Sequence, residues 1–228
     1  MEAQKPVLRL LCLRHGQTRY TGVLPDLTEE GQAKVKRAAL VDVSYWIRRN
    51  KIASAALRIV HSPAARAEGT ASIIAEAIRH PHPIVVNEEI GPMAWRDPIR
   101  CKEALGGLFG RGYIDYETEP TFGDSSLFET QSEMRERRFA HLARRIDAAA
   151  RGTEPQCEIE ISHYEFLCPL TAELFGVVAS ESTALQYVEP IELAFYEMGN
   201  DVYYVSGRFR NLDRSAAFSL RGRVFTAV

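Results

Sequence analysis

The chain has 228 residues, of which 46% are hydrophobic and 25% charged, with 28 Lys and Arg against 30 Asp and Glu. These proportions are typical of an ordinary globular protein and exclude a disordered or fibrous chain. The near-balanced charge argues against a dedicated nucleic-acid-binding protein, which usually carries a basic excess. The sequence contains no apolar run of about 18 residues, so we expect no membrane partner.

The cysteines are widely spaced and form no C-x-x-C pair; they are Cys12, Cys101, Cys157 and Cys168. This spacing favours buried thiols in a reducing compartment over a disulfide framework or a zinc site. We therefore expect a cytoplasmic protein that holds no metal.

The first half of the chain alternates apolar runs with helical patterns. Thr28, followed by two glutamates, predicts the start of a helix that extends to about residue 50. Ser62 and Pro63 predict the N-cap and first position of a second helix. Two short apolar runs predict buried strands, at residues 7–13 and 57–61, and residues 84–86 predict a third strand.

Residues 90–128 lack a clear period and hold six of the fifteen glycines. A segment of this length without periodicity usually carries function or moves. We interpret it as an irregular insert, acting as lid and specificity element, within one domain that spans residues 1–228.

The second half returns to regular patterns. Thr130 and Glu133 form a capping box that predicts a helix to about residue 150. A further helix is expected from about residue 165 to Gly176. Strands are predicted at residues 158–162, 191–197 and 202–206. Together, the alternating elements predict an α/β fold of three layers, with a mostly parallel central sheet and helices on both faces.

Polar residues stand where three of the predicted strands end, in the sequences Arg14-His15-Gly16, His61-Ser62 and Ser162-His163. In such sheets the functional site lies beyond the carboxyl ends of the strands. Gly16 would let an anion approach the backbone, and Arg66 lies one turn into a helix whose amides favour anions. Arginine pairs with phosphate oxygens in a bidentate manner, so the pattern predicts a phosphate-binding site.

Four motifs carry a resemblance to a known family. They are Arg14-His15-Gly16-Gln17-Thr18, Leu27-Thr28-Glu29-Glu30-Gly31-Gln32-Ala33, Ser62-Pro63-Ala64-Ala65-Arg66-Ala67-Glu68-Gly69-Thr70-Ala71, and Ser162-His163. In this order they resemble the histidine phosphatase superfamily, in its phosphoglycerate-mutase-like branch. The resemblance covers about residues 7–80 and 155–178, and leaves the middle and the tail uncovered.

The resemblance implies a covalent mechanism. His15 would attack phosphorus and become phosphohistidine, while Arg14, Arg66 and His163 stabilise the charge on the phosphoryl oxygens. A carboxylic acid would protonate the leaving oxygen and then act as base on water. The family pattern assigns this carboxylic acid to Glu89. No metal and no organic cofactor is needed in this scheme.

Two positions depart from the family pattern. Tyr20 and Thr21 stand where the opening motif usually continues with Trp-Asn, and the Thr21 hydroxyl can still donate to the phosphoryl group. Tyr164 and Glu165 follow the second histidine, where glycine is usual. Glu165 is therefore an alternative proton donor, as is Glu88 beside Glu89.

The residues expected to contact the substrate are Gly16, Thr18, Thr21 and Tyr164. The connection from Thr18 to Leu27 is shorter than in a typical phosphoglycerate mutase, which removes part of the substrate-covering loop. We therefore predict a phosphatase that acts on a small phosphomonoester. A phosphoglycerate-type phosphomutase and a phosphate-binding regulatory domain of low activity remain the alternatives.

Overall fold

The computed structural model describes residues 5–19, 26–106, 108, 119–152 and 156–228. Its strands are β1 (Leu8–Arg14), β2 (Leu57–His61), β3 (Val85–Val86), β4 (Gln156–Ser162), β5 (Pro190–Gly199), β6 (Val202–Phe209), β7 (Leu212–Ser219) and β8 (Val224–Thr226). Its longer helices are α1 (Glu29–Ala38), α2 (Ser44–Arg49), α3 (Ala65–Ala77), α4 (Pro98–Leu105), α5 (Gln131–Ala150) and α6 (Tyr164–Phe175). A π-helical segment, η1 (Ala39–Val43), joins α1 to α2, and short 3-10 turns are η2 (Ser54–Ala56), η3 (Glu88–Ile90) and η4 (Pro120–Gly123).

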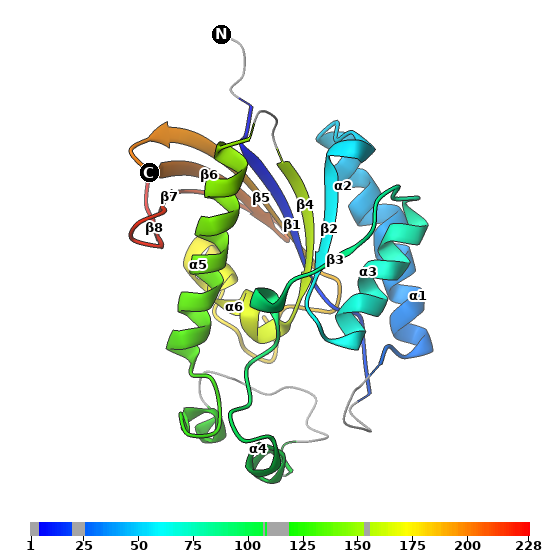
Figure 1. Ribbon diagram of the computed structural model, residues 1–228, viewed down its shortest axis with the longest axis vertical. Helices are drawn as coiled ribbons and strands as arrows, with labels where there is room; N and C mark the ends of the chain where they lie inside the picture. Colours follow the sequence, from blue (N-terminus) through cyan, green and yellow to red (C-terminus); the bar gives the residue numbers. More distant parts are fainter. Residues whose placement is uncertain (1–4, 20–25, 107, 109–118, 153–155) are drawn as a thin grey trace.

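All the strands belong to one sheet, in the order β3-β2-β4-β1-β5-β6-β7-β8 (Figure 1). The pairs β2–β3, β2–β4 and β1–β4 are parallel. The pairs from β1–β5 to β7–β8 are antiparallel. The predicted α/β class is confirmed, whereas the expectation of a mostly parallel sheet needs correction. Tight turns after β5 and β6 build antiparallel hairpins, with Asn200, Asp201 and Arg210 at positive φ.

Helices cover both faces of the sheet, as the sequence predicted. α5 and α6 lie on one face, and α1, α2 and α3 lie on the other (Figure 1). Alternate residues of β1 point to opposite faces, so Leu10 joins the core beneath α5 and α6 while Leu11 joins the core beneath α1 and α3. Among the described residues, no helix is both long and apolar enough to cross a membrane.

Several predicted helix ends are confirmed by their capping bonds. The Thr28 hydroxyl accepts from the Gly31 amide at 2.9 Å, and the helical run continues to Arg49 through the π-helical segment. Thr130 and Glu133 form the expected capping box at the start of α5. Gly176 ends α6 in the left-handed conformation, at φ 68°.

Three expectations are corrected. α3 begins at Ala65 with Ala64 as its N-cap, so Ser62 is not the cap; its hydroxyl contacts a histidine described below. The segment 90–128 is not wholly irregular, because Asp97 caps α4 and Pro98 occupies its first turn. The tail holds four strands rather than two, since β7 and β8 carry too little alternation to be recognised.

The loop that follows β1 packs closely on α1. The Thr28 amide donates to the Gln17 carbonyl at 3.0 Å, which brings this carbonyl over the first turn of the helix. A Cβ at Gly31 would lie 2.3 Å from the Gln17 oxygen. Gly31 therefore allows the loop to approach the helix.

We expect Gly31→Ala to lower the free energy of unfolding by about 1–3 kcal/mol, the usual cost of overpacking. Without a clash, alanine in a helix is favoured over glycine by about 1 kcal/mol. Gly69→Ala in α3 is the matched control, because its nearest neighbour is a flexible side chain, Leu27, at 3.3 Å. Urea unfolding measures both, and a Gly31→Ala protein as stable as the wild type would contradict this packing.

Candidate active site

The parallel register brings three strand ends to one edge of the sheet. Arg14 pairs with Ser162, and His61 pairs with Ile161. Beyond the ladders, the His15 amide donates to the Ser162 carbonyl at 3.0 Å. The residues that follow β1, β2 and β4 therefore lie side by side, as the sequence analysis expected.

Arg66 joins the two histidines of this edge. Its Nε donates to His15 Nε2 at 3.1 Å, and a terminal nitrogen of its guanidinium lies 3.0 Å from His163 Nδ1. The two imidazole rings are 5.1 Å apart, centroid to centroid. His15 is 2% exposed and His163 is fully buried. The first turn of α3 thus places one guanidinium against both rings.

The hydrogen bonds define the tautomer of each ring. His15 Nδ1 lies 2.7 Å from the Gly16 carbonyl, which can only accept, so the proton is on Nδ1 and Nε2 carries the lone pair. His163 Nδ1 accepts from Arg66, so its proton is on Nε2, which donates to the Ser62 hydroxyl at 2.6 Å. Both imidazoles are therefore neutral, and the lone pair of His15 Nε2 faces the Arg66 guanidinium.

Burial and positive charge keep both rings neutral. Desolvation lowers the pKa of His15 well below its usual range, and the charges of Arg66 and Arg14 lower it further. Desolvation also lowers the pKa of His163, with contributions from His15, Arg66 and Arg14. A neutral imidazole nitrogen beside guanidinium groups is suited to attack a tetrahedral oxyanion such as a phosphoryl group.

Arg14 is held by a segment that the sequence analysis missed. Its guanidinium lies over the ring of Tyr187 at 4.0 Å and over that of Tyr164 at 5.1 Å, and it donates to the Leu185 carbonyl at 2.8 Å. The Tyr187 ring is also 5.8 Å from that of His15. No motif marks residues 177–189; the single aromatic residue between α6 and β5 was the only available signal.

The residues expected to contact the substrate lie in different surroundings. A Cβ at Gly16 would lie 2.6 Å from a methyl of Val35, so the absent side chain allows close packing against α1. Thr18 is buried, and among the described residues its hydroxyl has no hydrogen-bond partner. Tyr164 is buried against Arg14. Thr21 lies outside the described residues.

The three candidate carboxyl groups are in different surroundings. Glu89 lies in η3 and pairs with α5, its carboxylate 3.1 Å from His141 Nδ1 and 2.9 Å from Arg144. Burial raises the pKa of Glu89, but hydrogen bonds from His141 and Arg144 outweigh it and lower the pKa overall. Glu165 accepts from the Met93 amide at 3.1 Å, and Glu88 is exposed. The surroundings of Glu89 favour its ionised form.

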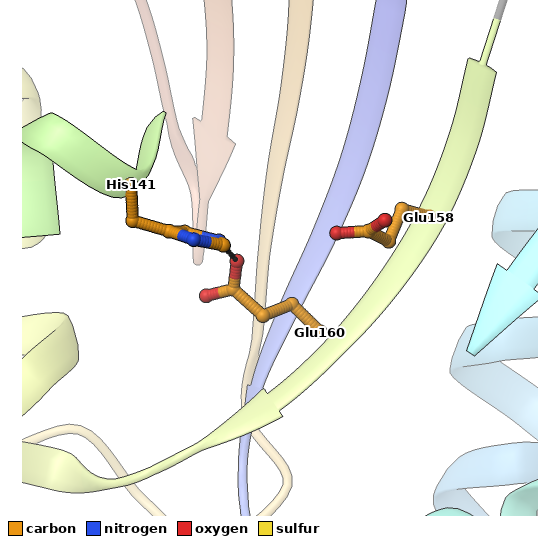
Figure 2. Close-up of side chains that lie close together, drawn as sticks. All are labelled: His141, Glu158 and Glu160. Atoms are coloured by element: carbon orange, nitrogen blue, oxygen red, sulfur yellow. Dashed lines mark hydrogen bonds and ion pairs between the residues drawn. The ribbon is translucent and has the colours of Figure 1, made fainter. Parts of the chain in front are cut away.

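One buried cluster on the α5 face of the sheet has the ligand types of a metal site. His141, Glu158 and Glu160 place ligand atoms within 4.8 Å of one another, and Figure 2 shows His141 bonded to Glu160. Arginines already neutralise both carboxylates. Arg138 pairs with Glu160, and Arg145 lies 3.1 Å from Glu158. The cluster is therefore an ion-pair network and does not fit a metal ion.

Comparison with known proteins supports the fold. No family model matches the chain, and no curated protein matches its sequence at a significant level. A mycobacterial glucosyl-3-phosphoglycerate phosphatase matches 92% of this chain and 99% of its own, at 18% identity and a TM-score of 0.59. The protein histidine phosphatase SixA, complexed with tungstate, matches over 91% and 96%, at 18% identity and a TM-score of 0.51.

A phosphoglycerate mutase from Bacillus anthracis matches over 85% of this chain and 89% of its own, at 15% identity and a TM-score of 0.57. These matches extend over most of both chains, so the protein has the phosphoglycerate-mutase-like fold that these structures share. The resemblance expected from the four motifs is confirmed at the level of the fold.

The lowered pKa values predict a pH dependence of stability. Between its folded pKa and its ordinary value near 6.5, each histidine binds more protons in the unfolded chain, so stability falls as the pH falls below about 6.5. Each contributes up to about 1.4 kcal/mol per pH unit. We expect His15→Gln to reduce this slope in urea unfolding measured from pH 7 to 5; an unchanged slope would contradict a neutral His15.

Tyr187 should support anion binding through Arg14. A cation–π contact contributes about 0.5–2 kcal/mol, so we expect Tyr187→Leu to raise the Kd for inorganic phosphate by about twofold to thirtyfold. Tyr187→Phe keeps the ring and is the matched control. Isothermal titration calorimetry measures both, and wild-type affinity in the leucine variant would contradict this role.

Proposed function

We propose that the protein is a phosphatase that hydrolyses a small phosphomonoester through a phosphohistidine on His15. The observation that carries the proposal is the neutral His15 ring, whose Nε2 lone pair faces the Arg66 guanidinium. The phosphatases and the mutase that share its fold support phosphoryl transfer as the reaction class. The free cysteines support a reducing compartment such as the cytoplasm.

In the first step, His15 Nε2 attacks phosphorus and the bond from phosphorus to the ester oxygen breaks. The leaving oxygen departs with the electron pair of that bond and takes a proton from a carboxylic acid where the leaving group requires one. Arg14, Arg66 and His163 bind the phosphoryl oxygens and stabilise the charge of the transition state. The incoming phosphoryl group replaces the imidazole as the partner of the Arg66 guanidinium. The Nδ1–H of His15 stays hydrogen-bonded to the Gly16 carbonyl, so the ring carries a positive charge while phosphorus is bound to Nε2.

In the second step, water attacks phosphorus, the bond to Nε2 breaks and its electron pair returns to His15. A carboxylate accepts the proton of the water. We assign this role to Glu89, with Glu165 and Glu88 as the alternatives. Gly16, Thr18, Thr21 and Tyr164 remain the proposed neighbours of the substrate.

We further propose that residues 1–228 form one domain in which the 90–128 insert determines specificity. Within the insert, the Trp95 ring contacts that of Phe128, and the Cys101 thiol donates to the Leu127 carbonyl at 3.0 Å. Against α5, Arg96 pairs with Glu133 at 2.5 Å, and Arg137 donates to the Pro92 carbonyl at 3.2 Å. Arg137 also donates to the Glu89 carbonyl, so α5 links the insert to the segment that carries Glu89.

His15→Ala should abolish hydrolysis of p-nitrophenyl phosphate, because no other group replaces the nucleophile. Circular dichroism checks that the variant is folded. His82→Ala, at a solvent-exposed histidine, is the matched control and should retain full activity. A folded His15→Ala protein with wild-type turnover would contradict the proposal.

The alternatives give different results in the same assays. A phosphomutase would interconvert phosphoglycerates when primed with a bisphosphoglycerate and would hydrolyse monoesters slowly. A phosphate-binding domain would bind phosphate without turnover and without forming a phosphoprotein.

A further inference from the structure

A chain of paired charges leads from the centre of the sheet to Glu89. At its buried end, Glu160 pairs with Arg138 and lies 3.0 Å from His141 Nε2. The other ring nitrogen of His141 lies 3.1 Å from Glu89. Figure 2 shows the bond from His141 to Glu160. On its exposed side, the Glu89 carboxylate meets Arg144 at 2.9 Å.

Both nitrogens of His141 face carboxylate oxygens, those of Glu160 at Nε2 and of Glu89 at Nδ1. With both carboxylates ionised, each nitrogen donates a hydrogen bond. Burial raises the pKa of Glu160, but Arg138 and His141 outweigh burial and hold the pKa at about 2. His141 is fully buried between the two carboxylates.

The backbone of Glu89 is fixed beside the catalytic edge. The Ser162 hydroxyl donates to the Ile90 carbonyl at 2.7 Å, and Ser162 immediately precedes His163. The Asn87 amide donates to the His61 carbonyl at 2.8 Å. From α5, Arg137 donates to the Glu89 carbonyl at 2.7 Å. Glu89 is therefore attached both to the strand ends and to α5.

Both oxygens of Glu89 thus accept from cationic donors on α5. A group that protonates a leaving oxygen must hold a proton at the working pH, whereas a base must be ionised. The charged groups that face Glu89 are His141 and Arg144 through the carboxylate, Arg137 through the backbone, and Glu88 as its neighbour in η3. Two cationic side chains beside the carboxylate favour the ionised form of Glu89, which can act as a base.

We propose that Glu89 serves only the second step, as the base on water, with His141 and Arg144 as positioning residues that keep it ionised. The substrates are then phosphoryl compounds whose leaving group departs without a proton, such as aryl and acyl phosphates. This inference rests on the proposed function and defines its substrate class.

With such substrates, the phosphorylation of His15 needs no acid. His15 Nε2 forms a bond to phosphorus, and the leaving oxygen departs as a phenolate or carboxylate with the electron pair of the broken bond. Water then forms a bond to phosphorus, Glu89 takes its proton, and the electron pair of the breaking P–N bond returns to His15. The proton passes from Glu89 to solvent.

The first test uses Glu89→Gln, a substitution at a side chain that is 44% exposed. Rapid mixing with p-nitrophenyl phosphate, quenched in alkali to preserve phosphohistidine, measures both steps. We expect the p-nitrophenol burst to keep the wild-type rate while dephosphorylation slows by about 100-fold or more, so that phosphoprotein accumulates. Alkyl phosphates should be poor substrates of the wild-type and variant proteins alike.

Two results with Glu89→Gln would overturn the inference. A slower burst without accumulated phosphoprotein, most severe for alkyl phosphates, would identify Glu89 as the acid. Unchanged kinetics would remove Glu89 from the reaction. If the wild-type protein forms no phosphoprotein with any substrate, the proposed function itself fails, and this inference fails with it.

The second test uses Arg144→Gln, which removes one cation from Glu89 at an exposed position of α5. The pKa of Glu89 should rise, so the dephosphorylation rate should begin to fall at a higher pH than in the wild type, with KM unchanged. Arg151→Gln, at an exposed arginine paired with Asp147, is the matched control and should leave the profile unchanged. An unshifted profile in Arg144→Gln would overturn the positioning role.

Discussion

The site depends on two buried imidazoles that lie against one arginine. Burial is the main cause that lowers the pKa of both rings, and the guanidinium charge lowers it further. Arg66 lies within hydrogen-bond distance of His15 and His163. The same guanidinium charge can bind an anion, so the neutral rings and a candidate anion site share one interaction.

This arrangement requires three strands to end at the same level. The parallel pairs β1–β4 and β2–β4 fix that level, because residues 157–161 of β4 have a defined partner on both sides. The antiparallel half of the sheet contributes through the segment that leads into it. Residues 177–189 connect α6 to β5 and place the Tyr187 ring against the guanidinium of Arg14. Val188 adopts a φ of 55°, uncommon for a β-branched residue, and its amide donates to the Arg14 carbonyl at 3.0 Å.

Most of the correct predictions came from local patterns in the sequence. Apolar runs located β1 and β2, and the capping residues Thr28, Thr130 and Gly176 located helix ends, because these features depend on a few adjacent residues. The strand-end residues could be grouped because parallel strands share an edge. The segment near Tyr187 could not be placed, since nothing adjacent to it indicates a contact with a residue 173 positions earlier in the chain.

The charges beneath α5 were missed for a different reason. A helical pattern is interpreted by its apolar face, and Phe139, Leu142 and Ile146 satisfied that interpretation. Arg138 and His141 lie on the same buried side. A usable signal was present in β4, where Glu158 and Glu160 alternate with apolar residues in a sheet expected to be covered on both faces. Buried carboxylates need cationic partners, and α5 supplies Arg138 and His141 to Glu160 and Arg145 to Glu158.

Burying these charges costs free energy, so the packing of the core alone does not explain why they are there. Desolvation costs several kcal/mol per ion, and apolar replacements of a buried pair are often as stable. Cys12, which contacts Arg138, stays a neutral thiol because burial raises its pKa to about 12. Arg138 and His141 are therefore paired with Glu160 and Glu89 rather than with Cys12. Because Glu89 is attached to the strand ends as well as to α5, the packing of α5 on the sheet and the charge state of Glu89 depend on each other.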